Sequence, residues 1–129
     1  MDFLDESGTM VEDHYLYMNV SSLISTAEHN KCKNWKCRTV GILKSVTGHF
    51  YLNDIYKESN PEPPTLLVST LYLNTVPNNI LPITVQLFGI MQWVEKPVLI
   101  VEIMQVIDPR MAINIDNALT SIAKFHCTI

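Results

Sequence analysis

The chain has 129 residues, of which 47% are hydrophobic and only 17% charged, against a charged fraction of about 25% in typical globular domains. This composition predicts a compact domain that hides part of its surface in a complex, and it excludes a disordered chain. The net charge of −4 at pH 7 excludes a generally basic nucleic-acid-binding protein, although it is compatible with a local basic patch.

The first segment, residues 1–13, contains acidic side chains and no Lys or Arg, which is typical of a disordered tail. The rest, residues 14–129, holds nine basic and eight acidic residues and is predicted to form one domain. Its three cysteines are an odd number, which favours a reduced, intracellular protein. No apolar run reaches the roughly 18 residues of a membrane span.

The domain is predicted to begin with a short helix over Val20–Glu28, capped by Ser21 or Ser22. A polar connection follows over His29–Arg38. It contains one aromatic residue, Trp35, among four basic ones: Lys31, Lys33, Lys36 and Arg38.

Five segments with strand-like patterns come next: Thr39–Val46, Phe50–Tyr56, Thr65–Leu73, Ile83–Trp93 and Val98–Ile107. Gly41 lies inside the first of them and marks a bulge or a bend. Thr47–His49 and Val94–Pro97 are predicted to be short hairpin turns. The other links, Glu58–Pro64 and Asn74–Pro82, are rich in proline, and the second is too interrupted to hold a helix.

The last element is a helix that starts after Asp108 as N-cap and Pro109 at the first position, and it runs to His126. A helix that lies on one core needs an apolar arc of only about 100°. Here the apolar side chains spread over roughly 160°, which leaves apolar surface for another protein. The arc consists of Met111, Ala112, Ile115, Ala118, Leu119, Ile122, Ala123 and Phe125.

Five short strands between two helices predict an all-β fold with flanking helices. The favoured architecture is a five-stranded OB-fold barrel with a short N-terminal helix and a C-terminal amphipathic helix, residues 109–126. A two-layer α+β sheet built from the same elements is the main alternative.

The hairpin residues resemble a known family. Val40–Val46, the turn Thr47–Gly48 and the segment Phe50–Asp54 are similar to the first hairpin of the smallest subunit of replication protein A and of the small subunit of the CST telomere-capping trimer. In both, a V-G-type strand turns through a glycine into an F-x-L-x-D strand. The leading helix, the V-x-x-x-G pattern at Val85–Gly89 and the closing helix follow in the same order, so the resemblance covers residues 18–126.

The resemblance implies a non-enzymatic assembly subunit in the nucleus, associated with chromosomes. Such subunits pair with a larger OB-fold protein through the C-terminal helix, in complexes that protect single-stranded DNA at telomeres or during replication. The alternative interpretation is that the same side chains only seat the helix on its own barrel. The partner-binding residues implied are Met111, Ile115, Ala118, Leu119, Ile122 and Phe125.

The alternative function is a stand-alone single-stranded nucleic-acid-binding module. OB-folds bind such strands with aromatic side chains in a cationic groove between two loops, but both predicted turns are short here. We therefore expect DNA contact mainly within the complex. The His29–Arg38 connection could equally be a solvated loop with Trp35 packed on the barrel, or a site for an acidic partner such as the chain's own tail. The candidate nucleic-acid-binding residues are Lys31, Lys33, Trp35, Lys36, Arg38, Lys44, Tyr51 and Tyr72.

Metal and catalytic sites have little support. His29, Cys32 and Cys37, with His126–Cys127 further away, provide a C-x₄-C spacing but no clean second ligand pair, so no metal or other cofactor is predicted. No catalytic motif is present, and an enzyme is not expected. Asp54, with Glu58 and Glu62, is interpreted as part of a solvated surface.

Overall fold

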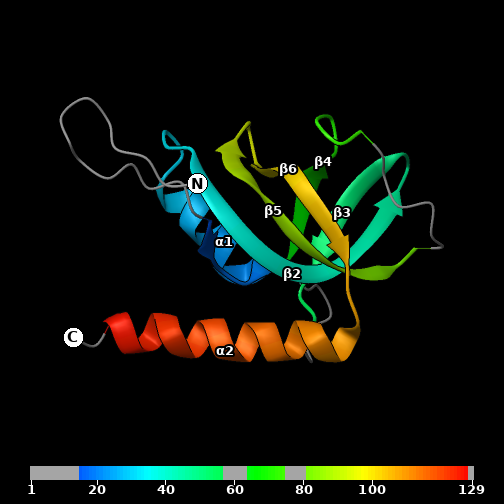
Figure 1. Cartoon of the computed structure of the whole chain (residues 1–129). Coiled ribbons are helices and arrows are strands. Elements are labelled where there is room, and N and C mark those ends of the chain that lie inside the picture. The colour runs from blue at the N-terminus through cyan, green and yellow to red at the C-terminus, as the bar shows by residue number, and fades with distance from the viewer. Residues whose placement is uncertain (1–14, 57–63, 75–80, 128–129) are drawn as a thin grey trace.

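The computed structural model describes residues 15–56, 64–74 and 81–127, with the side chains of 123–127 left out, so the predicted acidic tail lies outside the described residues (Figure 1). The described chain forms two helices and six strands. In chain order these are β1 (Leu16–Tyr17), α1 (Val20–His29), β2 (Trp35–Val46), β3 (His49–Asn53), β4 (Thr65–Ser69), β5 (Ile83–Trp93), β6 (Pro97–Val106) and α2 (Pro109–Cys127).

Strands β2 to β6 form a closed barrel. Their order is β2-β3-β4-β6-β5, and β5 pairs back with β2, so that the sheet closes on itself. The β4–β6 pairing is parallel and the other pairings within the barrel are antiparallel. Five strands closed in this order are the OB-fold, which confirms the predicted fold class. A two-layer α+β sheet is excluded because the outer strands pair with each other.

Strand β2 begins earlier than predicted. The polar connection was expected to extend to Arg38, but Trp35–Leu43 pair in continuous register with Ile83–Met91 of β5. The short strand β1, which the sequence pattern did not reveal, adds to the other edge of β2 through the pairs Leu16–Cys37 and Tyr17–Arg38. Lys36 and Arg38 therefore lie in a strand and not in a loop, because pairing with the neighbouring strands overrides the weak strand propensity of charged residues.

Three glycines mark places where the backbone of the barrel comes close to another strand or turns sharply. Gly41 is not a bulge, because its register with β5 is continuous; a Cβ there would lie 2.6 Å from the backbone oxygen of Asn53. The bulge lies instead in β6, where Glu102 is the extra residue opposite Phe88 and Gly89 and the two strands come close together. A hairpin turn was predicted over Thr47–His49; Thr47 and Gly48, both with positive φ, form it as a two-residue turn, and His49 already pairs with Val46.

Helix α1 closes one end of the barrel, where Val20, Leu23 and Ala27 join the core. Its N-cap is Asn19, which accepts a hydrogen bond from the Ser22 N–H, and not one of the predicted serines. The other core side chains come from the strands: Cys37, Leu43, Leu52, Leu66, Val68, Val85, Leu87, Met91, Leu99 and Val101.

Asp54 was expected to be a solvated residue, and this expectation is wrong. Its Oδ1 accepts a hydrogen bond from the Val20 N–H at 3.1 Å, and its Oδ2 accepts one from the Ser21 hydroxyl. The carboxylate thus ties the end of β3 to the first turn of α1, where a negative charge is favourable.

Helix α2 starts as predicted. The Asp108 carboxylate accepts a hydrogen bond from the Arg110 N–H at 2.7 Å, as an N-cap does. The helix runs along the outside of the barrel and continues past it (Figure 1). Among the helices of the described residues, none has the length and apolar character needed to cross a membrane.

Candidate binding surfaces

A buried carboxylate attaches α2 to the barrel. Asp116 is only 7% exposed, and its Oδ1 accepts a hydrogen bond from the Tyr17 hydroxyl at 2.6 Å. Its Oδ2 accepts one from the Tyr56 hydroxyl at 2.9 Å, and the Thr120 hydroxyl lies 3.4 Å from Oδ1. Beside it, Ala112 is fully buried. A small side chain and a hydrogen-bonded carboxylate thus make the contact that an apolar stripe would usually make.

Sequence reasoning assigned no role to Asp116. The available signal was a carboxylate four residues after Ala112, inside the apolar arc, where a residue of a surface helix faces the core. Burial and the hydrogen bond to Asp116 raise the pKa of Tyr17 well above its usual range, so the Tyr17 hydroxyl stays protonated and able to donate.

The attachment leaves an apolar stripe of α2 uncovered. Met111 and Ile122 are 51% and 52% exposed, Ala118 is exposed, and Ile115 is half-buried. We call these four residues the α2 seam. Their spacing of four, three and four residues places them on one flank of the barrel-facing side, the pattern of a helix that packs against another helix.

The remaining residues of the predicted partner set lie differently. Leu119 is half-buried and sits on the helix between the seam and the barrel-facing side. The Phe125 side chain lies outside the described residues. Ile113, which was not predicted, is 39% exposed and lies on the other flank of the helix.

The basic residues near the start of β2 are spread over the barrel surface. The ammonium of Lys31 lies 4.6 Å from the ring centroid of Trp93, and that of Lys36 lies 5.3 Å from the ring of Tyr15. Each distance is within the range of a cation–π interaction. These cations were expected on a loop, but strand β2 holds Lys36 on the outside of the barrel.

Arg38 extends this group through the Phe88 ring, which lies edge-on to Tyr15 with 5.3 Å between the ring centroids. Its guanidinium lies 5.3 Å from the Phe88 ring, and its Nε donates to Gln86 Oε1 at 2.6 Å. Gln86 in turn donates to Gln105 at 2.7 Å. Arg38 therefore joins the outer faces of β2, β5 and β6.

The other candidate nucleic-acid-binding residues lie apart from this region. Lys44 and Tyr51 are directly opposite each other in the β2–β3 pairing, so they share one outer face of the barrel. Tyr72 is 68% exposed beyond the end of β4. The structure therefore does not gather the predicted set into one groove.

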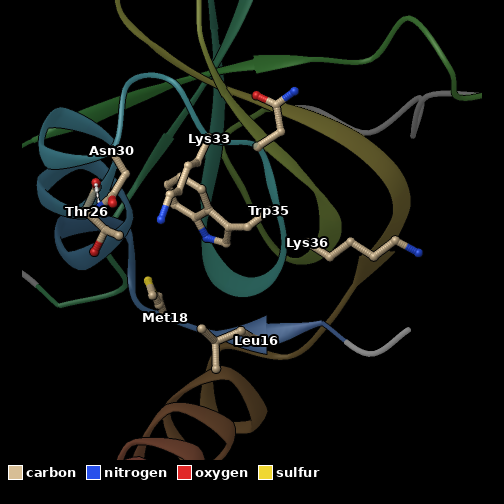
Figure 2. Close-up of a pocket in the computed structure, with 8 residues that line it drawn as sticks. Leu16, Met18, Thr26, Asn30, Lys33, Trp35 and Lys36 are labelled. Carbon is tan, nitrogen blue, oxygen red and sulfur yellow. Dashed lines mark hydrogen bonds between the residues drawn. The ribbon is translucent and has the colours of Figure 1, made fainter. Parts of the chain in front are cut away.

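A pocket of about 430 Å³ lies between the end of α1, β1 and the start of β2 (Figure 2). Two of the predicted residues, Lys33 and Trp35, line it closely, and Lys36 extends away from it. Trp35 also packs against the barrel core. The other lining residues are Leu16, Met18, Thr26, Asn30 and Asn34.

The described metal-ligand candidates, His29, Cys32 and Cys37, do not come together, and the side chains of His126 and Cys127 lie outside the described residues. Cys37 lies in the barrel core, and burial raises the pKa of its thiol to about 12. Cys32 is exposed, and the His29 ring bonds to the Ser25 carbonyl oxygen. Within the described parts of the chain, no three His, Cys, Asp or Glu residues are grouped in a way that could hold a metal ion.

These features define a small OB-fold protein with a helix at each end of its barrel sequence and an uncovered apolar seam on the second helix. Solved structures contain the same fold. A chain in the crystal structure of the S. pombe Stn1–Ten1 complex matches with a TM-score of 0.61 at 12% identity, over 88% of this chain and 96% of that one. The telomere capping protein Ten1 of S. pombe matches with a TM-score of 0.56 at 11% identity, over 86% and 99%. No protein-family model and no curated protein sequence matches the chain.

Proposed function

We propose that this chain is a non-catalytic small subunit of a telomere-capping complex of the CST type, which acts in the nucleus at chromosome ends. In this proposal it binds a larger OB-fold protein through the α2 seam. The likeness in fold to Ten1, and to a chain of the Stn1–Ten1 complex, supports the class of protein. The α2 seam supports the mode of assembly.

The uncovered seam is the observation that carries the proposal. Burying an apolar side chain such as Met or Ile stabilises an interface by about 1.5–3 kcal/mol when the side chain was fully exposed before. Met111 and Ile122, each about half-exposed, lie eleven residues apart on one stripe. Three turns of helix thus present a continuous apolar edge, which suits a second helix packed alongside.

The anchoring of α2 at Asp116 favours such an interface. Hydrogen bonds from Tyr17 and Tyr56 fix the rotation of the helix about its own axis, because Asp116 must face the barrel. The seam is thereby held in one orientation before the partner arrives. A pre-organised surface loses less conformational freedom on binding, so more of the contact energy contributes to affinity.

The first experiment is affinity purification of the tagged full-length chain from nuclease-treated native extract, followed by mass spectrometry. We expect a larger OB-fold protein to be recovered, and its identity separates telomere capping from general replication. A chain that is recovered alone and monomeric would contradict the proposal and favour a stand-alone nucleic-acid-binding module.

Charge variants test the binding surface. Ala118→Glu with Ile122→Glu introduces two carboxylates on the seam, and we expect it to abolish recovery of the partner because buried unpaired charges are costly. Asn114→Glu with Ser121→Glu places the same two charges on the exposed polar face that points away from the barrel, outside the seam, and should leave recovery unchanged. Circular dichroism should show both variants folded. Loss of the partner in both variants, or in neither of them, would contradict the role of the seam.

A further inference from the structure

The pocket between α1, β1 and β2 is not used by the proposed assembly surface, and its chemistry is specific. Its volume of about 430 Å³ is within the range of about 300–1,000 Å³ found for small-ligand sites. One side is apolar, formed by Leu16 and Met18, and another consists of the Trp35 indole. Polar side chains from Thr26 and Asn30 complete it, so a planar group with polar edges suits it better than a purely apolar one.

The walls are held in place by hydrogen bonds. The Asn30 side chain donates to the Thr26 carbonyl oxygen at 2.9 Å, and the Lys33 N–H donates to the Asn30 carbonyl oxygen at 3.0 Å. The Met18 N–H donates to the Arg38 carbonyl oxygen at 3.1 Å, which fixes the apolar side against β2. The pocket is therefore formed by the fold itself and not by loose side chains.

The indole of Trp35 provides a hydrogen-bond donor on the pocket side. Its Nε1 is buried, has no hydrogen-bond partner among the described residues, and points into the space near Met18 (Figure 2). A buried donor left unpaired is unfavourable and rare in folded proteins. Because a methionine side chain is flexible, a ligand that displaces Met18 slightly can present an acceptor to this N–H.

The position of α1 indicates which part of a ligand enters the pocket. The last turn of the helix, at Thr26–His29, forms one wall, and the negative end of the helix dipole disfavours an anion inside. Positive charge lies at the rim instead, on the exposed side chain of Lys33, while Lys31 and Lys36 lie against the Trp93 and Tyr15 rings. A neutral planar group belongs inside and an anionic one at the rim.

We propose that this pocket binds one unstacked base of a single-stranded nucleic acid, with a neighbouring phosphate held by Lys33. A neutral base stacked or hydrogen-bonded at Trp35, next to a charged backbone, matches this division of charge. The site lies away from the outer face that carries Lys44 and Tyr51, where OB-folds usually bind such strands. The choice of DNA as the strand rests on the proposed function, whereas the pocket rests on its own contacts.

The fluorescence of Trp35 reports on the site directly. The chain has two tryptophans, so Trp93→Phe in the full-length protein leaves Trp35 as the single probe. Oligo-dT of about 12 nucleotides, within the site size of an OB-fold, is titrated at low ionic strength. We expect saturable quenching of Trp35. An abasic strand of the same length has the same charge but no base, and it should not quench.

Point variants then locate the strand without altering the core. Lys33→Glu, at the exposed rim, should weaken binding about ten-fold because it removes a phosphate contact and adds repulsion. Lys44→Ala with Tyr51→Ala, on the usual OB-fold face, should change affinity less than about two-fold within the normal spread of surface variants. The seam variant Ala118→Glu with Ile122→Glu should also bind normally, so that failure of the assembly proposal stays distinguishable.

Several results would overturn the proposal. Equal quenching by the abasic strand or by poly-glutamate would mean that the surface only attracts negative charge, as a site for an acidic protein would. Binding that is lost in Lys44→Ala with Tyr51→Ala and retained in Lys33→Glu would place the strand on the usual face. No quenching at low ionic strength would exclude the site.

Discussion

Two aspartates determine how the helices attach to the barrel. Asp54 binds the first turn of α1 through Val20 and Ser21, and Asp116 receives the Tyr17 and Tyr56 hydroxyls beneath α2. Hydrogen bonds to charged groups contribute about 1.5–3 kcal/mol each, more than bonds between neutral groups. Single carboxylates thus connect elements that are far apart in the sequence.

The pairing with Asp116 predicts a pH dependence of stability. The pKa of Tyr17 is raised in the folded protein by burial and by the hydrogen bond to Asp116. The folded state therefore holds this proton more tightly than the unfolded state, in which a tyrosine ionises near pH 10. The stabilisation that Tyr17 provides is therefore fully present below that pH. We expect the free energy of unfolding to fall as the pH rises above about 10.

Urea unfolding between neutral and alkaline pH measures this effect. Tyr17→Phe should lower the stability at pH 7 by about 1–2 kcal/mol, since Asp116 loses a donor, and should make the alkaline decline shallower. Tyr72→Phe, which alters an exposed tyrosine, should keep both the stability and the decline of the natural chain. A Tyr17→Phe curve parallel to that of the natural chain would contradict the assignment.

The long elements owe their positions to different interactions. Helix α2 follows its own periodicity and cap, and begins at the predicted residue. The start of strand β2 instead depends on the strands beside it, because β5 pairs with it from Trp35 onward and β1 pairs with its other edge. The bulge at Glu102 in β6 belongs to the same class of tertiary effects, since it lies where β5 and β6 come close together at Gly89.

The close approach at Gly89 predicts a selective loss of stability. A Cβ on this residue would lie 2.2 Å from the Ile100 backbone oxygen, so Gly89→Ala requires β5 and β6 to separate. We expect a loss of about 1–3 kcal/mol, as in other overpacked sites, measured by urea unfolding. Gly48→Ala is the control. It meets no atom within 4 Å and should cost only about 1 kcal/mol, from its positive φ. A Gly89→Ala variant as stable as Gly48→Ala would show that the strands adjust freely.

In the molecule as a whole, the two candidate surfaces are neighbours that share no residue. The α2 seam lies on the second helix, while the pocket lies at the end of α1, and no residue lines both. Leu16, Met18 and Thr26 of the pocket also line a hollow together with Thr120 of α2, which is two residues from the seam residues Ala118 and Ile122. Its charge is also uneven, since the acidic side chains of residues 1–13 have no basic counterpart within that segment.

This asymmetry predicts an electrostatic effect of the N-terminal segment. Removal of residues 1–13 changes a chain of net charge −4 into one with nine basic and eight acidic residues. We expect tighter binding of oligo-dT at low ionic strength, measured by fluorescence anisotropy, because repulsion of the phosphates decreases. The gain should disappear near 1 M salt, where the screening length is about 3 Å. A full-length variant with the five acidic residues changed to Asn or Gln should reproduce it. A gain in affinity that persists at high salt would contradict this electrostatic effect and would indicate that residues 1–13 contact the binding site directly.

Local patterns in the chain were sufficient for the barrel and its ends. Alternating or continuous apolar patterns located the five strands, although β4 ends at Ser69 and not at Leu73. The hairpin turn after Val46 was located in the same way, and Asp108–Pro109 specified the start of α2. Each of these depends on residues a few positions apart, and their physical chemistry is the same in any fold. The exposed apolar edge of α2 could be predicted for the same reason, because the helix has more apolar surface than one core requires.

The roles of Asp54 and Asp116 became apparent only once the elements were assembled. Asp116 looks like an ordinary helical carboxylate until Tyr17, 99 positions earlier, is brought to 2.6 Å from it. Likewise, the chain around Trp35 resembles a polar loop until β5 pairs with it and α1 encloses the pocket. Such contacts join distant parts of the chain, and which distant residues meet is settled by the closure of the barrel and the packing of its helices, not by any local pattern.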